Sequence, residues 1–271
     1  MDIITSRVCR RISGLVVSFI LTAAVSVTGY AQDRIKPFVL AGTSEVTVGE
    51  AVAEATAQLS TAGFEVLAEF SPYENARVIA FTSPALKAAA QETDMGGFAA
   101  VLRASVTDVD GVTQLAYMNP QYLAQAYRLQ SDLADVSAAL SVALGAEQAF
   151  GSKRGLKPKK LRKYHYMMGM EYFDDPYKLG EFDTQDAALA AVAAGLANND
   201  VGVSPLYRLT LSDSGATVFG VAMAGEGDKG KFHDDGFQME VVDFGELRST
   251  AYLPYQILVE DGSVRALHMR F

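Results

Sequence analysis

The sequence predicts an α+β protein made of two tandem β-α-β-β-α-β-β units, each with an antiparallel-rich sheet and helices on one face. Three observations predict this fold class. Short apolar segments with strand-like alternation are separated by turn signals, Ala-rich segments have helical spacing behind a threonine cap, and the same order of segments occurs twice along the chain. The expected boundaries are residues 32–150 for the first unit, 151–163 for a basic linker and 164–271 for the second unit.

The first unit begins with a short apolar strand. Thr47 then caps a helix that Gly63 ends. A Ser83-Pro84 pair opens a second helix, and Asp110-Gly111 is a strong hairpin signal between two apolar runs. The expected strands are residues 38–43, 64–70, 77–82, 98–109 and 112–118, and a long helical region is expected over residues 121–144.

The second unit is expected to repeat this order. Lys163–Phe173 is its predicted first strand, and Thr184 caps the helix that follows. Two further strands are expected at residues 205–212 and 217–223, and a final hairpin around Asp261-Gly262. Residues 239–247 fit either a strand or a helix. Setting Thr184 on Thr47 and Asp261 on Asp110 aligns the two halves, which predicts an internal duplication.

The first 31 residues have the three parts of a secretory signal peptide. Arg7, Arg10 and Arg11 precede an apolar run over residues 12–27, and Gly29 and Ala31 provide small side chains before a cut. The alternative is a retained membrane anchor, but the run is short of the roughly 20 residues that a bilayer requires. We therefore expect cleavage near Ala31, a periplasmic or secreted protein, and no stable membrane span after cleavage.

Composition narrows the chemistry of the mature segment. The only cysteine, Cys9, lies in the signal peptide, which excludes disulfides, thiol nucleophiles and Cys-ligated metals from the rest of the chain. Loss of the signal peptide takes the net charge from −9 to −11, because that segment holds three arginines and one aspartate. This charge disfavours nucleic acid as a partner. No cofactor is predicted.

Several short motifs resemble domain-of-unknown-function family number 302. In the first unit they are Val78–Pro84, Gly96-Gly97, the Asp110-Gly111 hairpin and Tyr117–Pro120. In the second unit they are Leu253–Val259 and Asp261–Val264. The resemblance implies two divergent copies of a compact α+β fold that tends to dimerise. It implies no established activity, so no functional residues are carried over. The first unit departs from the pattern, with Leu102-Arg103 where the family's Leu-Pro would fall.

One candidate metal site comes from a cluster of soft ligands. His165 and Met167 lie in a segment rich in thioethers, and His268 lies on the last strand, which could pair near it. Imidazole and thioether ligands suit Cu(I). The alternative is an ordinary core strand, since methionine also fills cores.

Two charged clusters are further candidates. The linker carries seven basic residues from Lys153 to Lys163. Among them, Lys157, Lys159 and Lys160 are expected to contact a partner, an acidic face of the same protein or anionic lipid. The alternative is a solvated linker. His233, Asp234 and Asp235, with Glu240 and Asp243 downstream, are compatible with a dispersed acid/base pair or with a solvated acidic loop.

These observations favour an exported, non-catalytic protein that binds a small or hydrophobic ligand, or a partner, between its units or across a homodimer. No catalytic residues are predicted, because the chain has no HExxH, GxSxG or SxxK motif. Two alternatives remain: a periplasmic copper-binding accessory protein and a hydrolase with dispersed carboxylates.

Overall fold

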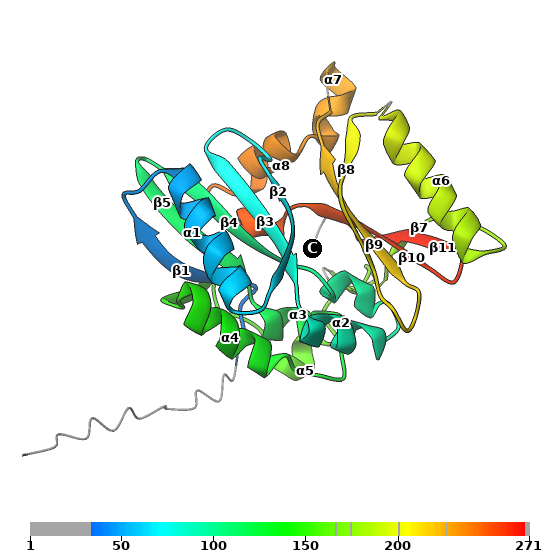
Figure 1. The fold of residues 1–271 in the computed structure, drawn as a ribbon, viewed down its shortest axis with the longest axis horizontal. Helices are drawn as coiled ribbons and strands as arrows, with labels where there is room; N and C mark the ends of the chain where they lie inside the picture. Colours follow the sequence, from blue (N-terminus) through cyan, green and yellow to red (C-terminus); the bar gives the residue numbers. More distant parts are fainter. Residues whose placement is uncertain (1–33, 166, 174, 200, 226, 269–271) are drawn as a thin grey trace, which may run out of the picture. The chain divides into compact units, whose positions relative to one another are not determined.

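The structure, a computed structural model, describes residues 34–165, 167–173, 175–199, 201–225 and 227–268 (Figure 1). The signal-peptide prediction therefore lies outside the described residues. In chain order the elements of the first unit are β1 (Phe38–Ser44), α1 (Val48–Thr61), β2 (Glu65–Phe70), β3 (Ala76–Thr82), α2 (Pro84–Gln91), η1 (Gly96–Ala99), β4 (Leu102–Val109), β5 (Val112–Met118), α3 (Pro120–Ala126), α4 (Ala134–Leu144) and β6 (Gln148–Phe150). The remaining elements are α5 (Pro158–Leu161), β7 (Tyr177–Glu181), α6 (Gln185–Asn198), β8 (Val203–Thr210), β9 (Thr217–Met223), α7 (Gly227–Gly230), η2 (Lys231–His233), α8 (Asp235–Val242), η3 (Thr250–Tyr252), β10 (Tyr255–Glu260) and β11 (Ser263–Ala266).

The predicted α+β class is confirmed, with two antiparallel sheets. The first has six strands in the order β2-β3-β4-β5-β1-β6, and the second has five in the order β7-β11-β10-β9-β8. Helix α1 starts at a capping box, in which the Thr47 side chain accepts from the Glu50 amide and the Glu50 side chain accepts from the Thr47 amide. Its buried residues Val52, Ala55 and Leu59 face the first sheet, beside α4 (Figure 1).

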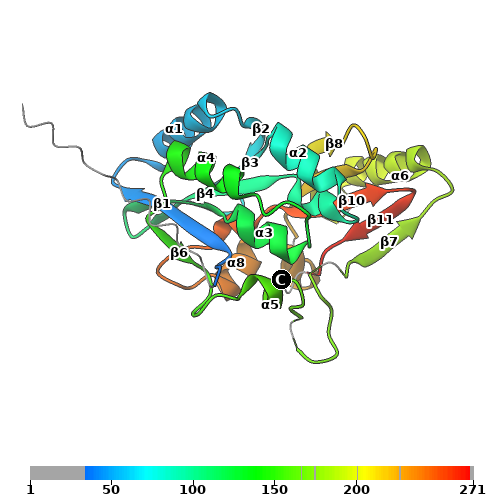
Figure 2. The same cartoon turned by 90° about the horizontal axis from the view of Figure 1, so that it is seen from below.

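The opposite face of the first sheet is covered by the second unit. Along β4, Arg103 and Thr107 point to one face and the alternating apolar side chains point to the other. The Thr107 hydroxyl lies 3.2 Å from the hydroxyl of Thr250 in η3, and Gln114 Nε2 donates to the carbonyl of Glu246. Figure 2 shows α1 and α8 on opposite sides of these strands. The segment between β9 and β10 therefore closes the polar face of the first sheet through hydrogen bonds.

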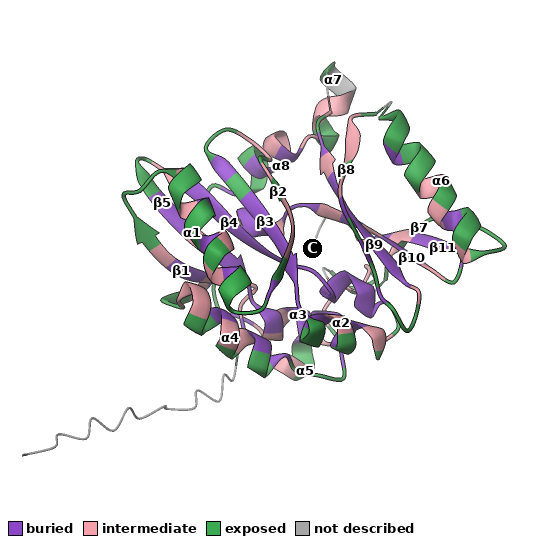
Figure 3. Cartoon of the chain, in the orientation of Figure 1, coloured by how far each residue is buried: buried purple, intermediate pink, exposed green. Residues whose placement is uncertain are grey.

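The second sheet lies between α6 and the first unit. Ala188 and Leu196 of α6 pack in a small cluster with Val259 and neighbouring strand residues. From the other face, Val218 and Leu258 join the main core, which also contains Phe98 and Leu102 of the first unit. Buried residues consequently run through the facing strands of both sheets (Figure 3).

The two sheets have the same strand order if β7 is taken as the counterpart of β1, and β8 to β11 as the counterparts of β2 to β5. The second sheet then reads 1-5-4-3-2, which is the order of the first sheet without β6. The contacts between the units are reciprocal in the same way, because η1 contacts β9 and β10 while η3 contacts β3 and β4. The element order β-α-β-β-α-β-β also describes β7 to β11 if α8 is counted as the second helix.

The expected continuous helix over residues 121–144 is wrong. It is two helices, α3 and α4, separated by a turn in which Arg128 and Leu133 have φ angles of 53° and 55°. The break buries Leu129 and Leu133, at 2% and 3% exposure. The spacing rule missed it because no Gly or Pro marks the position.

The predicted strand at Lys163–Phe173 is also wrong. In the described part of this segment, strand pairing is limited to an isolated bridge between His165 and Tyr172. Gly169 has a φ of 81°, and the Met170 amide donates to the Met167 carbonyl, so the chain turns. The first strand of the second unit is instead β7, which pairs with β11.

Among the described residues, no helix is long and apolar enough to cross a membrane.

Candidate functional site

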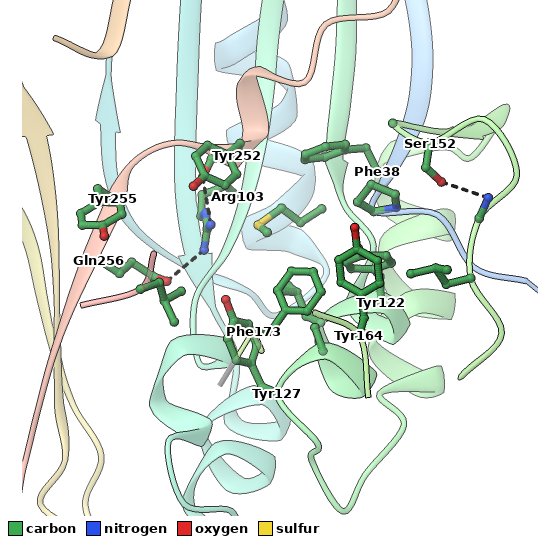
Figure 4. Close-up of a pocket in the computed structure, with 18 of the residues that line it drawn as sticks. Phe38, Arg103, Tyr122, Tyr127, Ser152, Tyr164, Phe173, Tyr252, Tyr255 and Gln256 are labelled. Carbon is green, nitrogen blue, oxygen red and sulfur yellow. Dashed lines mark hydrogen bonds between the residues drawn. The ribbon is translucent and has the colours of Figure 1, made fainter. Parts of the chain in front are cut away.

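A cavity of about 460 Å³, which we call the central cavity, lies between the two units (Figure 4). Most of its lining is apolar or aromatic. The first unit contributes Pro37, Phe38, Arg103, Met118, Tyr122, Leu123, Ala126 and Tyr127. The basic linker, residues 151–163, which we call the connector, contributes Gly151, Ser152, Arg154, Gly155 and Leu156. The second unit contributes Tyr164, Phe173, Tyr252, Pro254, Tyr255, Gln256 and Leu267.

Helix α3 forms one aromatic wall of the central cavity. The Asn119 side chain caps the helix by accepting from the Gln121 amide and also donates to the Lys36 carbonyl, which ties the helix start to the chain before β1. Spacing on a helix then places Tyr122 and Ala126 on the cavity side. The Tyr122 ring meets Phe173 edge-on at 6.0 Å between centroids, and Phe173 lies 5.7 Å from Tyr164.

The connector forms a second wall. Gly151 and Gly155 have φ angles of 93° and 65°. An added Cβ would lie under 3 Å from the Phe38 ring at Gly151, and under 3 Å from the Ile35 carbonyl oxygen at Gly155. Ile35 and Leu156 pair as a β-bridge in the same place. The connector is thus held directly against the chain that enters β1, and its glycines permit that approach.

Arg103 forms the polar end of the central cavity. Its guanidinium donates to the carbonyls of Val101 and Tyr252, and to Gln256 Oε1 at 3.3 Å (Figure 4). Gln256 Nε2 in turn donates to the Tyr207 hydroxyl at 2.9 Å. Arg103 is 6% exposed, and its Nε is buried without a hydrogen-bond partner.

Four tyrosines around the cavity, Tyr122, Tyr127, Tyr252 and Tyr255, are neutral at physiological pH. Burial raises the pKa of Tyr252 to about 12 and raises the pKa of Tyr122, Tyr127 and Tyr255 as well. The described lining contains no Asp, Glu, His or Cys. The cavity therefore offers apolar surface, neutral hydroxyls and one buried cation, and it offers no general base or strong nucleophile.

Comparison with protein families gives a match over residues 41–146 to the family described as "Domain of unknown function DUF302". This segment is a DUF302 domain. A solved structure, the uncharacterized conserved protein DUF302 from Bacillus stearothermophilus, matches 40% of this chain and 93% of its own, at 20% identity and a TM-score of 0.35. No curated protein matches the chain.

The DUF302 domain contributes only part of the central cavity. Arg103, Met118 and the α3 residues fall inside the matched range, while the connector and the second-unit residues lie after it. The sequence marked Arg103 only as a departure from the family's Leu-Pro pair. Its partner Gln256, and Tyr207 to which Gln256 donates, were not predicted as site residues, because they come together only when the second sheet packs on the first.

The predicted copper ligands have different surroundings. His165 Nδ1 is hydrogen-bonded to the Met167 carbonyl, and the Met167 side chain is exposed. His268 is buried against the Tyr177 ring, with centroids 3.6 Å apart, and its Nε2 lies 3.9 Å from Glu171. Within the described ranges no group of three or more His, Cys, Asp or Glu side chains is arranged to hold a metal ion. The copper site stays a prediction.

The predicted partner-binding lysines are exposed on and just before α5. In the described structure the side chains of Lys157, Lys159 and Lys160 form no ion pair. The helix is anchored by Arg162, which donates to the carbonyls of Arg128 and Leu129. Lys159 and Lys160 line a shallow surface hollow that shares Leu156 and Tyr164 with the central cavity. A role in binding a partner remains a prediction.

The acidic cluster around Asp234 and Asp235 is not uniformly solvated. Asp234 caps α8 by accepting from the Phe237 amide, and Asp235 is 1% exposed, with one carboxyl oxygen accepting from the Met223 amide. Burial, with a smaller contribution from the nearby Asp234, raises the pKa of Asp235 to about 7. Asp243 is buried too, and it accepts from the Ser249 amide. Both carboxylates hold backbone in place, and neither lines the central cavity.

Proposed function

We propose that this protein binds a small, largely apolar molecule in the central cavity, without chemically transforming it. The observation that carries the proposal is a cavity of about 460 Å³ lined by aromatic and aliphatic side chains. Small-molecule sites in proteins typically have volumes of about 300–1,000 Å³ and a mostly apolar lining with a few polar groups. The central cavity has this size and this composition.

The chemistry of the lining favours binding over catalysis. Hydrolysis by paired carboxylates needs two acids that converge on the substrate. Asp235 and Asp243 are the buried acids in the described part of the second unit, but they are bonded to backbone amides outside the cavity lining. This arrangement supports a structural role for both residues and a non-catalytic cavity.

We also propose that binding takes place outside the cytoplasm. The support is the charged, apolar and small-residue order of the first 31 residues, which is typical of a secretory signal. Mass spectrometry of the protein purified from the periplasm should give a mature chain that begins near Gln32. A full-length chain in the membrane fraction would contradict this proposal.

We further propose that the second unit is a diverged second copy of the DUF302 domain, so that the cavity occupies the interface of a fused pair. Support comes from the equal strand order of the two sheets and the reciprocal contacts of η1 and η3. A family alignment that places residues 164–271 on the same model as residues 41–146 would test this, and a consistent match to another family would overturn it.

The binding proposal is tested with N-phenyl-1-naphthylamine, a neutral aromatic dye that fluoresces in apolar sites. We expect the wild-type protein to bind one dye molecule, counted by native mass spectrometry. Ala126, which is 2% exposed and lines the cavity, is replaced in Ala126→Phe to fill the space. Affinity should fall at least tenfold.

The matched control is Val142→Phe, which adds a ring at a side chain that is 89% exposed on α4. It should leave the affinity for the dye unchanged. If the wild-type protein does not bind the dye, or if Ala126→Phe binds it as tightly as the wild type, the proposed function is wrong.

A further inference from the structure

Arg103 places a positive charge where solvation is poor. It lies on β4, on the sheet face turned toward the second unit, and is 6% exposed. Moving a charged group out of water is costly unless an opposite charge or a full set of hydrogen bonds compensates it. The partners of this guanidinium therefore indicate what the site is built to accept.

Every hydrogen-bond acceptor of Arg103 in the described structure is neutral. They are two backbone carbonyls and the side-chain oxygen of Gln256, at 3.0–3.3 Å, and Nε has no partner. Among the described residues, Arg103 forms no ion pair with a carboxylate. Arg265 shows the contrast, because it lies 3.6 Å from Glu260 and 3.9 Å from Asp94.

The guanidinium is also held in a defined orientation. Gln256 is oriented by its bond to the Tyr207 hydroxyl, so its amide oxygen faces Arg103. The Nη2 atom of Arg103 donates a hydrogen bond to the carbonyl of Tyr252 at 3.0 Å. A cation fixed in this way recognises an anion with little further loss of conformational freedom.

The surface beside the cavity is positively charged, as Arg103 is. The connector carries seven basic residues between Lys153 and Lys163 in a chain of net charge −9. Its exposed Arg154 lines the central cavity. The shallow surface hollow lined by Lys159 and Lys160 shares Leu156 with the central cavity. A local positive field of this kind attracts an organic anion that the rest of the protein repels.

We propose that the ligand of the central cavity is an amphipathic organic anion, whose carboxylate or similar head group pairs with Arg103 and whose apolar body packs against the aromatic walls. This inference rests on the proposed function and names the ligand class of the same site. The basic connector attracts the ligand, and the buried Arg103 favours ligands with an anionic head group over neutral ones.

The experiment compares two dyes with the same aromatic skeleton. N-phenyl-1-naphthylamine is neutral, and 8-anilino-1-naphthalenesulfonate adds a single anionic group. Wild-type protein should bind the anionic dye at least tenfold more tightly than the neutral one. Arg103→Met should remove this preference by weakening the anionic dye tenfold or more, with the neutral dye changed less than twofold. Arg103→Lys should retain part of the preference.

Arg154→Met is the matched control, since it removes the same charge from the exposed rim of the same cavity. It should weaken the anionic dye less than threefold. Equal binding of the two dyes by the wild type, or loss of the preference in Arg154→Met and not in Arg103→Met, would overturn the inference and leave the proposed function standing. Absence of binding of the neutral dye would overturn the proposed function itself.

A competition on the wild-type protein decides the matter if Arg103→Met does not fold. Decanoate should displace the neutral dye at a concentration at least tenfold lower than 1-decanol at pH 8. Equal displacement by the two competitors would overturn the inference.

Discussion

Gly220 leaves room for the ring of Tyr207, whose hydroxyl accepts from Gln256 behind Arg103. A Cβ at Gly220 would overlap the ring atoms of Tyr207, although the strand conformation itself would tolerate a side chain. One glycine in β9 thus determines whether the chain Tyr207–Gln256–Arg103 can form. The polar end of the cavity depends on a residue that does not touch it.

Gly220→Ala should therefore destabilise the protein by about 1–3 kcal/mol, the range for overpacking of a filled core. Equilibrium unfolding in urea measures this change. Gly195→Ala is the control, because no atom lies within 4 Å of its added Cβ and the position is inside α6. It should stabilise the protein by about 0.5–1 kcal/mol. Equal effects of the two substitutions would show that the ring of Tyr207 moves freely.

Asp235 couples stability to pH. Burial raises its pKa from 3.8 to about 7, so the folded protein keeps a proton that the unfolded chain releases above pH 4. Because the folded state then binds more protons, the free energy of unfolding decreases as pH rises from about 4 to about 7. At 1.36 kcal/mol per pKa unit the decrease reaches at most about 4 kcal/mol.

Asp235→Asn should remove this decrease, since the amide stays neutral and can still accept from the Met223 amide. Urea unfolding at pH 5 and at pH 8 gives the comparison. The wild type should lose more stability between these two values than the variant. Asp243 and Glu260, whose pKa is also raised by burial, are present in both proteins and cancel in the difference. An identical pH dependence of the free energy of unfolding in the two proteins would contradict the raised pKa of Asp235.

At the scale of elements, local signals define the ends of helices and hairpins well. The capping box of α1 satisfies free amides at the helix start with Thr47 and Glu50 alone, and both residues are exposed. Asp110 and Gly111 reverse the chain with φ angles of 53° and 83°. Such features were predictable because every participating atom lies within a few residues along the chain.

Thr47→Ala should destabilise the protein by about 1 kcal/mol, because it removes the acceptor of the Glu50 amide. Chemical denaturation measures the loss. Thr61→Ala serves as the control, since the Thr61 hydroxyl bonds back to the Ala57 carbonyl and caps no free amide. Its effect should stay within about 0.5 kcal/mol of zero. A comparable loss in both variants would argue against the capping box as the cause.

Elements were mispredicted where tertiary contacts outweigh periodicity. The apolar spacing over residues 121–144 is helical throughout, yet the chain leaves the helix at Arg128 to bury Leu129 and Leu133. The alternation in Lys163–Phe173 is strand-like, yet no strand of the second sheet takes it as a partner in the described structure. A strand needs a partner, and a sequence pattern does not specify one.

At the scale of the whole molecule, the two units share one hydrophobic core. Tyr207, Leu209 and Leu258 of the second unit belong to the same cluster as Phe98 and Leu102 of the first. Separation of the units would expose this apolar surface to water, at about 25 cal/mol per Å². The shared core therefore makes the folding of one unit depend on the other.

We expect the segment from residue 33 to 271 to unfold in one cooperative transition, with equal calorimetric and van't Hoff enthalpies. Differential scanning calorimetry tests this. A fragment of residues 33–163 should lack a cooperative transition, because it loses the second-unit side chains of the core. Two separate transitions in the longer chain, or a cooperative transition in the fragment, would show that the units fold independently.

The sequence by itself determined the fold class, most strands of both sheets, the helix caps and the turns, because those depend on neighbours along the chain. Tertiary structure decided the site. The central cavity takes residues from Pro37 to Leu267, and its buried cation meets Gln256 only after the second sheet packs on the first. In the sequence, Arg103 is one polar residue in an alternating strand. The packing of the two units leaves it buried without a carboxylate partner in the described chain, and this is the observation on which we propose an anionic ligand.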